Sequence, residues 1–279
     1  MVANLKNTIL VPTDFSEVCS NAANQAIEAA KLLNYKVVVL HVINSETLAY
    51  LQSENLPVSY IDIKLKTIAK DLMSLGEINV EYLSREGSIF NTISEVASEI
   101  GANLIYLGTH GKIGIQRFIG SFALKVVIGS PVPVVVVQKR PFDKGYKDII
   151  LPITSETGPW EKAKWAVYIA RQFNAAIHIL LIGDASEKVK DTANQIATYF
   201  EKNQVSYSYK ETDKHSQFAQ QTIDYATSNN ADLIMIMTDP DKGFINFILN
   251  SFDEEIIFNT SQIPVMCVNP RKLNYDFFA

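Results

Sequence analysis

The chain contains the same succession of segments twice, and this internal repeat constrains its fold more than any other feature. The matched pairs are Lys147–Pro152 with Lys6–Pro12, Ala231–Ile234 with Ala102–Ile105, and Ile263–Val268 with Val132–Val137. Each copy is far longer than the roughly 20–45 residues of a solenoid repeat, so the pattern predicts a duplicated domain. We expect the two domains over residues 1–141 and 146–279, joined by the polar, turn-rich stretch between them.

Within each copy, short β-rich runs alternate with amphipathic stretches of helical length. The strands expected in the first copy are Thr8–Pro12, Lys36–Ile43, Ile78–Leu83, Leu104–Leu107 and Pro133–Val137. A first helix is expected directly after Ser16. Three more are expected over Ile61–Leu75, Ile89–Ile100 and Ser121–Ile128. This order predicts an α/β fold with two tandem, Rossmann-like domains of the adenine nucleotide alpha-hydrolase type, each built on a five-stranded parallel sheet covered by helices on both faces.

The last strand of each copy carries no charge. Val134–Val137 and Val265–Val268 would invite aggregation if they were exposed sheet edges. We therefore expect these two strands to pair and to join the halves into an intramolecular pseudo-dimer. The alternative is that each strand is interior to its own sheet. Two such pseudo-dimers could pair further into a homodimer.

The composition excludes several classes of partner. The net charge of the 279 residues is -5 and the basic residues are scattered, which argues against nucleic acid as a partner. No apolar run approaches the roughly 20 residues that cross a membrane, and no signal peptide is expected at the start. The two cysteines, Cys19 and Cys267, are far apart, so neither a disulfide framework nor a zinc site is expected. A cytoplasmic location fits these features.

A glycine-punctuated loop follows the apolar run Asn103–Leu107. Open parallel sheets bind ligands at the carboxyl ends of their strands, and Gly108 stands at such an end. Gly108 and Gly111 can bring backbone N–H groups close to a ligand, and Gly120 and Ser121 are expected to open the next helix, whose N-terminus attracts anions. The loop therefore favours phosphate binding. The alternative is that these glycines are turn residues.

Several segments together resemble the universal stress protein family in its tandem two-domain form. They are Ile9–Ser16, Leu40–Val42, Gly108–Ser121 and Pro131–Val137. The resemblance implies an adenine nucleotide, ATP, ADP or AMP with or without Mg²⁺, bound in the N-terminal half. A loop of the form Gly-x2-Gly-x9-Gly-Ser/Thr would hold the phosphates, and an Asp and a Val after the first two strands would hold the adenosine. Matched by position, the expected ligand-binding residues are Pro12, Thr13, Asp14, Val42, Gly108, His110, Gly111, Gly120 and Ser121.

The chain departs from that pattern in two ways. Eight residues rather than nine separate Gly111 from Gly120, and Ala123 stands where the family often has a second hydroxyl. Asp14 also has a purely structural interpretation, because an Asp between a strand and a helix commonly hydrogen-bonds nearby N–H groups.

The second copy has lost the expected ligand-binding residues. Gly108, Gly111, Gly120 and Asp14 are replaced there by Met237, Pro240, Asn250 and Thr154. Pro240 has no N–H to donate to a phosphate. We therefore expect one ligand per chain, in the N-terminal half, with the second copy serving structure or partner binding.

Three functions are compatible with these features. The first is a stress-response regulatory protein whose bound nucleotide changes a surface that a protein partner recognises. The second is a nucleotide-free scaffold, and the third is an enzyme such as a slow ATPase. The sequence shows no nucleophile–base pair, metal-ligand cluster or Walker-type loop, so the chain is not expected to be an enzyme.

Overall fold

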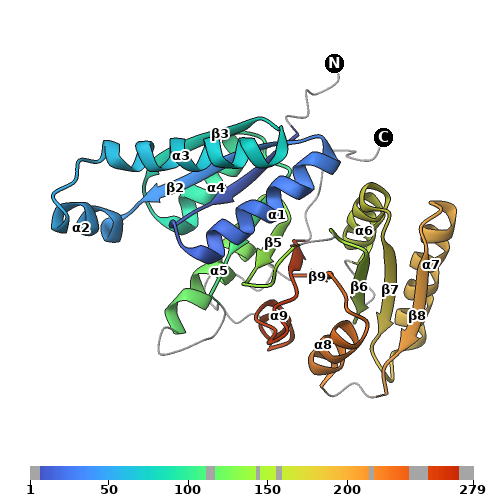
Figure 1. The fold of residues 1–279 in the computed structure, drawn as a ribbon. Coiled ribbons are helices and arrows are strands. Elements are labelled where there is room, and N and C mark those ends of the chain that lie inside the picture. Colours follow the sequence, from blue (N-terminus) through green and yellow to red (C-terminus); the bar gives the residue numbers. More distant parts are fainter. Residues whose placement is uncertain are drawn as a thin grey trace. The chain divides into compact units, whose positions relative to one another are not determined.

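The chain folds into two compact units, Met1–Phe142 and Asp143–Ala279 (Figure 1). A computed structural model describes residues 7–110, 117–142, 145–154, 159–213, 217–238 and 251–269. It determines each unit by itself, so the expected pairing of the two halves stays a prediction.

The N-terminal unit is a parallel sheet flanked by helices (Figure 1). Its elements are β1 (Thr8–Pro12), α1 (Glu17–Leu33), β2 (Lys36–Ile43), α2 (Ser45–Ser53), α3 (Ser59–Gly76), β3 (Val80–Glu86), α4 (Ile89–Glu99), β4 (Leu104–Gly108), α5 (Arg117–Gly129) and β5 (Val134–Val137). All strands are parallel, in the order β3-β2-β1-β4-β5. Helix α1 packs against α3, and α4 packs against α5. Strands β2 and β3 thus lie on one side of β1, and β4 and β5 lie on the other. Open parallel sheets bind ligands at the point where the strand order reverses in this way.

The C-terminal unit repeats this plan. Its elements are β6 (Asp148–Ile153), α6 (Pro159–Phe173), β7 (Ala176–Leu181), α7 (Glu187–Lys202), β8 (Tyr207–Glu211), α8 (Phe218–Ser228), β9 (Leu233–Met237), α9 (Ser251–Ile257) and β10 (Val265–Val268). Its strands are also parallel, in the order β8-β7-β6-β9-β10. The prediction of two five-stranded parallel sheets is confirmed.

The two units even repeat a side-chain contact between their first and fourth strands. Asn103, just before β4, accepts a hydrogen bond from the Thr8 N–H at 2.9 Å. Asp232, at the same place before β9, accepts from the Lys147 N–H at 2.9 Å. Both bonds satisfy a backbone donor at the start of the central strand, where the sheet ladder ends.

The near-continuous apolar strands of the sequence become the buried centre of each sheet. Ile9, Leu10 and Val11 of β1 and Ile149, Ile150 and Leu151 of β6 are all fully buried. Burial on both faces is the reason these strands show no polar alternation. Among the described helices, none is long and apolar enough to span a membrane, and both cysteines are free and buried.

Two segments of the N-terminal unit differ from what the sequence predicted. Helix α5 already includes Arg117, so Ser121 lies inside the helix and the expectation that Gly120 and Ser121 open it is wrong. The segment between β2 and α3 contains a helix, α2, that the sequence did not predict. Asn44 stabilises its start, because the Asn44 side chain accepts a hydrogen bond from the Thr47 N–H at 2.9 Å.

Candidate functional site

A cavity of about 580 Å³ lies at the carboxyl end of the N-terminal sheet. The ends of β1, β2 and β4 contribute to its wall, and so do α1, α2, α3, α4 and α5. Its volume falls within the roughly 300–1,000 Å³ of typical small-molecule sites. Because it also lies where the chain crosses from β2 to β4, this cavity is the candidate ligand site.

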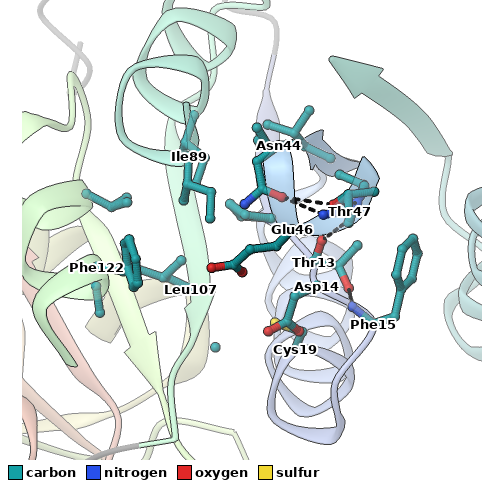
Figure 2. Close-up of a pocket in the computed structure, with 18 of the residues that line it drawn as sticks. Thr13, Asp14, Phe15, Cys19, Asn44, Glu46, Thr47, Ile89, Leu107 and Phe122 are labelled. Atoms are coloured by element: carbon teal, nitrogen blue, oxygen red, sulfur yellow. Dashed lines mark hydrogen bonds between the residues drawn. The ribbon is translucent and has the colours of Figure 1, made fainter. Parts of the chain in front are cut away.

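The cavity has a polar side and an apolar side (Figure 2). Thr13 and Asp14 lie on one side, and Ile89, Leu107 and Phe122 lie on the other. The Glu46 side chain, from α2, reaches between the two groups. A flat ring with apolar faces and a polar edge, such as a nucleobase, is complementary to this arrangement.

Asp14 has a structural role and also lines the cavity. The Ser16 N–H donates to its Oδ1 at 2.8 Å, which is the helix-start contact expected for an Asp in this position. Burial acts to raise the pKa of Asp14, but hydrogen bonds from Ser16 and Cys19 and the charge of His110 outweigh it, so the pKa is lowered. Asp14 is therefore an ionised hydrogen-bond acceptor at neutral pH.

His41 connects the end of β1 to α2. Its Nδ1 lies 2.7 Å from the Thr13 carbonyl oxygen, and its Nε2 lies 3.1 Å from the Thr47 hydroxyl. The ring also stacks on Phe15, with 4.5 Å between ring centroids. Burial lowers the pKa of His41, although the hydrogen bond to Thr13 opposes the shift. His41 thus helps to position α2 beside the cavity, and with it the side chain of Glu46.

The remaining charge on the cavity wall comes from Lys64 of α3. Its ammonium lies 4.1 Å from the centre of the Phe15 ring, on which it forms a cation–π contact. Phe15 itself has a positive φ of 69°, a backbone conformation that a bulky residue rarely adopts. Lys64 and His41 both contact Phe15 and thereby fix this corner of the cavity. In the described part of the chain, no three His, Cys, Asp or Glu side chains gather as a metal site.

Gly108 is required by packing. A β-carbon added there would lie 2.7 Å from the Val18 carbonyl oxygen and 2.8 Å from the Cys19 nitrogen. The start of α1 therefore passes directly over the end of β4. This close approach explains Gly108 without any ligand, although the residue also lines the cavity.

The structure brings about half of the expected site residues together. Those that line the cavity are Pro12, Thr13, Asp14, Val42 and Gly108. His110 acts on the pKa of Asp14 but does not line the cavity. Gly120 and Ser121 lie in α5, and Gly111 lies outside the described residues.

Thr109 is a cavity residue that the sequence did not single out. It follows β4 directly and is 1% exposed. Its N–H donates to the Val137 carbonyl at 2.8 Å. Its hydroxyl is buried and has no hydrogen-bond partner among the residues that the structure describes.

In the C-terminal unit, two charged side chains are buried near the carboxyl end of β6. Lys162 is 4% exposed, and its ammonium donates to the Pro152 carbonyl. Burial lowers the pKa of Lys162 to about 7, and the carboxylate of Asp253 opposes the shift. Asp253 is itself 4% exposed and stands where the N-terminal unit has Ala123. Sequence reasoning did not predict this buried pair.

The C-terminal unit also contains a Ser–His–Asp cluster that the sequence did not reveal. The Ser208 hydroxyl lies 2.9 Å from Nδ1 of His178, and Nε2 of His178 lies 2.9 Å from Oδ1 of Asp148. The three residues lie near the amino ends of the adjacent strands β8, β7 and β6. Ser208 is exposed, and the cluster lies at the end of the sheet opposite to the one where such folds bind ligands.

Comparison with known proteins finds relatives of the N-terminal half and solved structures that share the fold of nearly the whole chain. The model of the universal stress protein family matches residues 6–138. A universal stress protein of Methanocaldococcus jannaschii is 34% identical over 145 residues, which cover 49% of this chain and 84% of that protein. The structure of a universal stress protein from Archaeoglobus fulgidus covers 95% of this chain and 98% of its own, with a TM-score of 0.79 and 17% identity. A functionally unknown protein from Pseudomonas aeruginosa covers 95% of this chain and 92% of its own, with a TM-score of 0.67 and 15% identity.

Proposed function

Because this chain belongs to the universal stress protein family, we propose that it is a regulatory protein that binds one adenine nucleotide in its N-terminal unit. The observation that carries the proposal is the convergence of Asp14, Val42 and Gly108 on one cavity. These residues come from the ends of three different strands, and the sequence motifs selected them independently of the cavity.

The charges around the cavity favour one orientation of the nucleotide. Asp14 and Glu46 can accept hydrogen bonds from the amino group of adenine and from ribose hydroxyls, but they repel phosphate. The phosphates would therefore point away from both carboxylates, toward Gly108 and α5. Mg²⁺ bound with the nucleotide would neutralise part of the phosphate charge.

Helix α2 is the element through which a nucleotide would change the protein surface. Glu46, Thr47 and Tyr50 line the cavity from α2, while Leu48 of the same helix is exposed. A ligand that contacts the inner side would favour one position of α2 over others. We propose that a protein partner recognises that position. We further propose that the chain is not primarily an enzyme.

Equilibrium dialysis of the full chain against Mg-ATP tests this function. Asp14→Asn keeps an oxygen that can accept the Ser16 N–H but removes the charge, so we expect it to fold and to bind ATP at least tenfold more weakly, as for loss of a charge-assisted hydrogen bond. Asp62→Asn is the control, because Asp62 is exposed and bonds Ser84 outside the cavity. If the wild-type chain retains no nucleotide, the nucleotide-free scaffold replaces this proposal.

A further inference from the structure

We infer that the Thr109 hydroxyl is a ligand-binding group, which donates a hydrogen bond to an oxygen of the ribose–phosphate part of the nucleotide. The inference rests on the proposed function and adds a residue that the glycine loop motif does not contain. It starts from the unpaired hydroxyl of Thr109, a residue that lines the cavity.

An unpaired buried hydroxyl is costly. Burying it without a partner costs about 1–3 kcal/mol, and most buried polar groups in proteins are therefore paired. Among the described residues, side-chain atoms of Ser16, Gln25 and Ser94 are also buried and unpaired, but of these four residues only Thr109 lines the cavity. A ligand in the cavity is the partner that can satisfy it.

The C-terminal unit provides an internal comparison. Thr238 follows β9 as Thr109 follows β4, and its N–H donates to the Val268 carbonyl at 3.0 Å, just as that of Thr109 donates to Val137. The Thr238 hydroxyl, however, donates to the Asn269 side chain. The unit that lacks the glycines of the loop motif thus satisfies this hydroxyl internally. The unit that keeps the glycines leaves the equivalent hydroxyl without a partner among the described residues.

Thr109 is only 1% exposed, so its hydroxyl is enclosed in its present rotamer. Ala123 lines the same cavity, whereas the equivalent residue of the C-terminal unit is the larger, charged Asp253. The hydroxyl and the methyl group of a threonine share one carbon atom, and a change of χ1 rotamer exchanges their positions. A single rotamer change can therefore turn the enclosed hydroxyl toward a bound nucleotide.

The test compares Thr109→Val with Thr238→Val in the full chain. Valine has nearly the shape of threonine and lacks the hydroxyl. Thr109→Val should lower the affinity for ATP about tenfold, which is the loss of one hydrogen bond to a charged oxygen. Without ligand, its melting temperature should equal or exceed that of the wild type, because no existing hydrogen bond is lost. Thr238→Val should show the reverse pattern, with a lower melting temperature and unchanged affinity.

A third variant, Thr109→Ser, keeps the hydroxyl and should retain most of the affinity. Wild-type affinity in Thr109→Val would overturn the inference while leaving the proposed function intact. A melting temperature for Thr109→Val as low as that for Thr238→Val would show that the hydroxyl is already paired in the folded protein, which also overturns it. Absence of ATP binding by the wild type would overturn the proposed function and this inference together.

Discussion

Gly108 and Val18 lie so close together that a β-carbon at residue 108 would stand 2.7 Å from the Val18 carbonyl oxygen. The neighbouring atom belongs to the backbone of α1 and cannot swing away as a side chain could. Gly108→Ala should therefore lower the free energy of unfolding by roughly 1–3 kcal/mol, the usual cost of overpacking a core. Urea denaturation of the two proteins measures this difference.

Gly129→Ala is the matched control for that substitution. A β-carbon at Gly129, the last residue of α5, would make only an ordinary contact of 3.6 Å with the Ser94 hydroxyl. Alanine also favours the helix over glycine, so this variant should be as stable as the wild type or slightly more stable. Equal stability of Gly108→Ala and the wild type would show that α1 does not pass over β4 as described.

Removing the cap of α2 should weaken nucleotide binding. Asn44→Ala loses the bond to the Thr47 N–H and should destabilise the helix start by about 0.5–2 kcal/mol. Because α2 carries Glu46 into the cavity, we expect faster amide exchange in α2 and a lower ATP affinity. Ser186, whose side chain accepts from the Val189 N–H, caps α7 in the other unit, so Ser186→Ala should leave the affinity unchanged. An unaltered ATP affinity in Asn44→Ala would show that α2 does not contribute to nucleotide binding.

The buried Lys162 should make stability depend on pH. Its pKa is lowered from 10.5 to about 7, so between these values the unfolded chain binds a proton that the folded chain has released. Stability therefore rises with pH across this window and is lost as the pH falls toward 7. Relative to Lys162→Met, the wild type should gain at most about 1.4 kcal/mol per pH unit from this residue. Urea unfolding of both proteins at several pH values between 7 and 10 measures the gain.

Lys164→Met provides the comparison for this pH dependence, because Lys164 is an exposed residue of the same helix. It should follow the wild type at every pH. If Lys162→Met also follows the wild type, the Lys162 ammonium is not buried in the folded chain.

The Ser208–His178–Asp148 cluster should not act as a hydrolase. Its hydrogen bonds match those of a nucleophile and its base, yet Ser208 is exposed, so water would solvate a developing oxyanion in place of preorganised donors. A fluorophosphonate probe should leave Ser208 unmodified, and Ser208→Ala should not change the rate of ester hydrolysis. Labelling that disappears in Ser208→Ala would instead identify a catalytic serine.

Much of the fold could be predicted from the sequence because its signals are local and occur twice. Apolar runs such as Ile9–Val11 alternate with stretches of helical periodicity, and the same order of segments in both copies strengthens the prediction. The predicted start of α5 lies four residues too late, because Gly120 and Ser121 resemble a helix start but lie within the helix. Helix α2 was missed because only Asn44 marks its beginning.

The site residues that belong to a sequence motif could be predicted. Those whose role depends on the presence or absence of a hydrogen-bond partner in the folded chain could not. Asp14 and Gly108 belong to recognisable motifs, and both reach the cavity. Thr109 carries no such signal, because its significance lies in a missing partner that only the folded structure reveals. Lys162 and Asp253 are likewise far apart in sequence, and nothing local indicates that both become buried.

Isothermal titration of the full chain with Mg-ATP shows how many nucleotides one chain binds. We expect one site per chain, because Asp14 and Gly108 line the N-terminal cavity, whereas Thr154 and Met237 stand at their positions in the other unit. Thr154→Asp, which restores an acidic residue at the position of Asp14, should leave the stoichiometry at one. Two equivalent sites per chain would contradict the asymmetry between the units, and the absence of any binding would contradict nucleotide recognition itself.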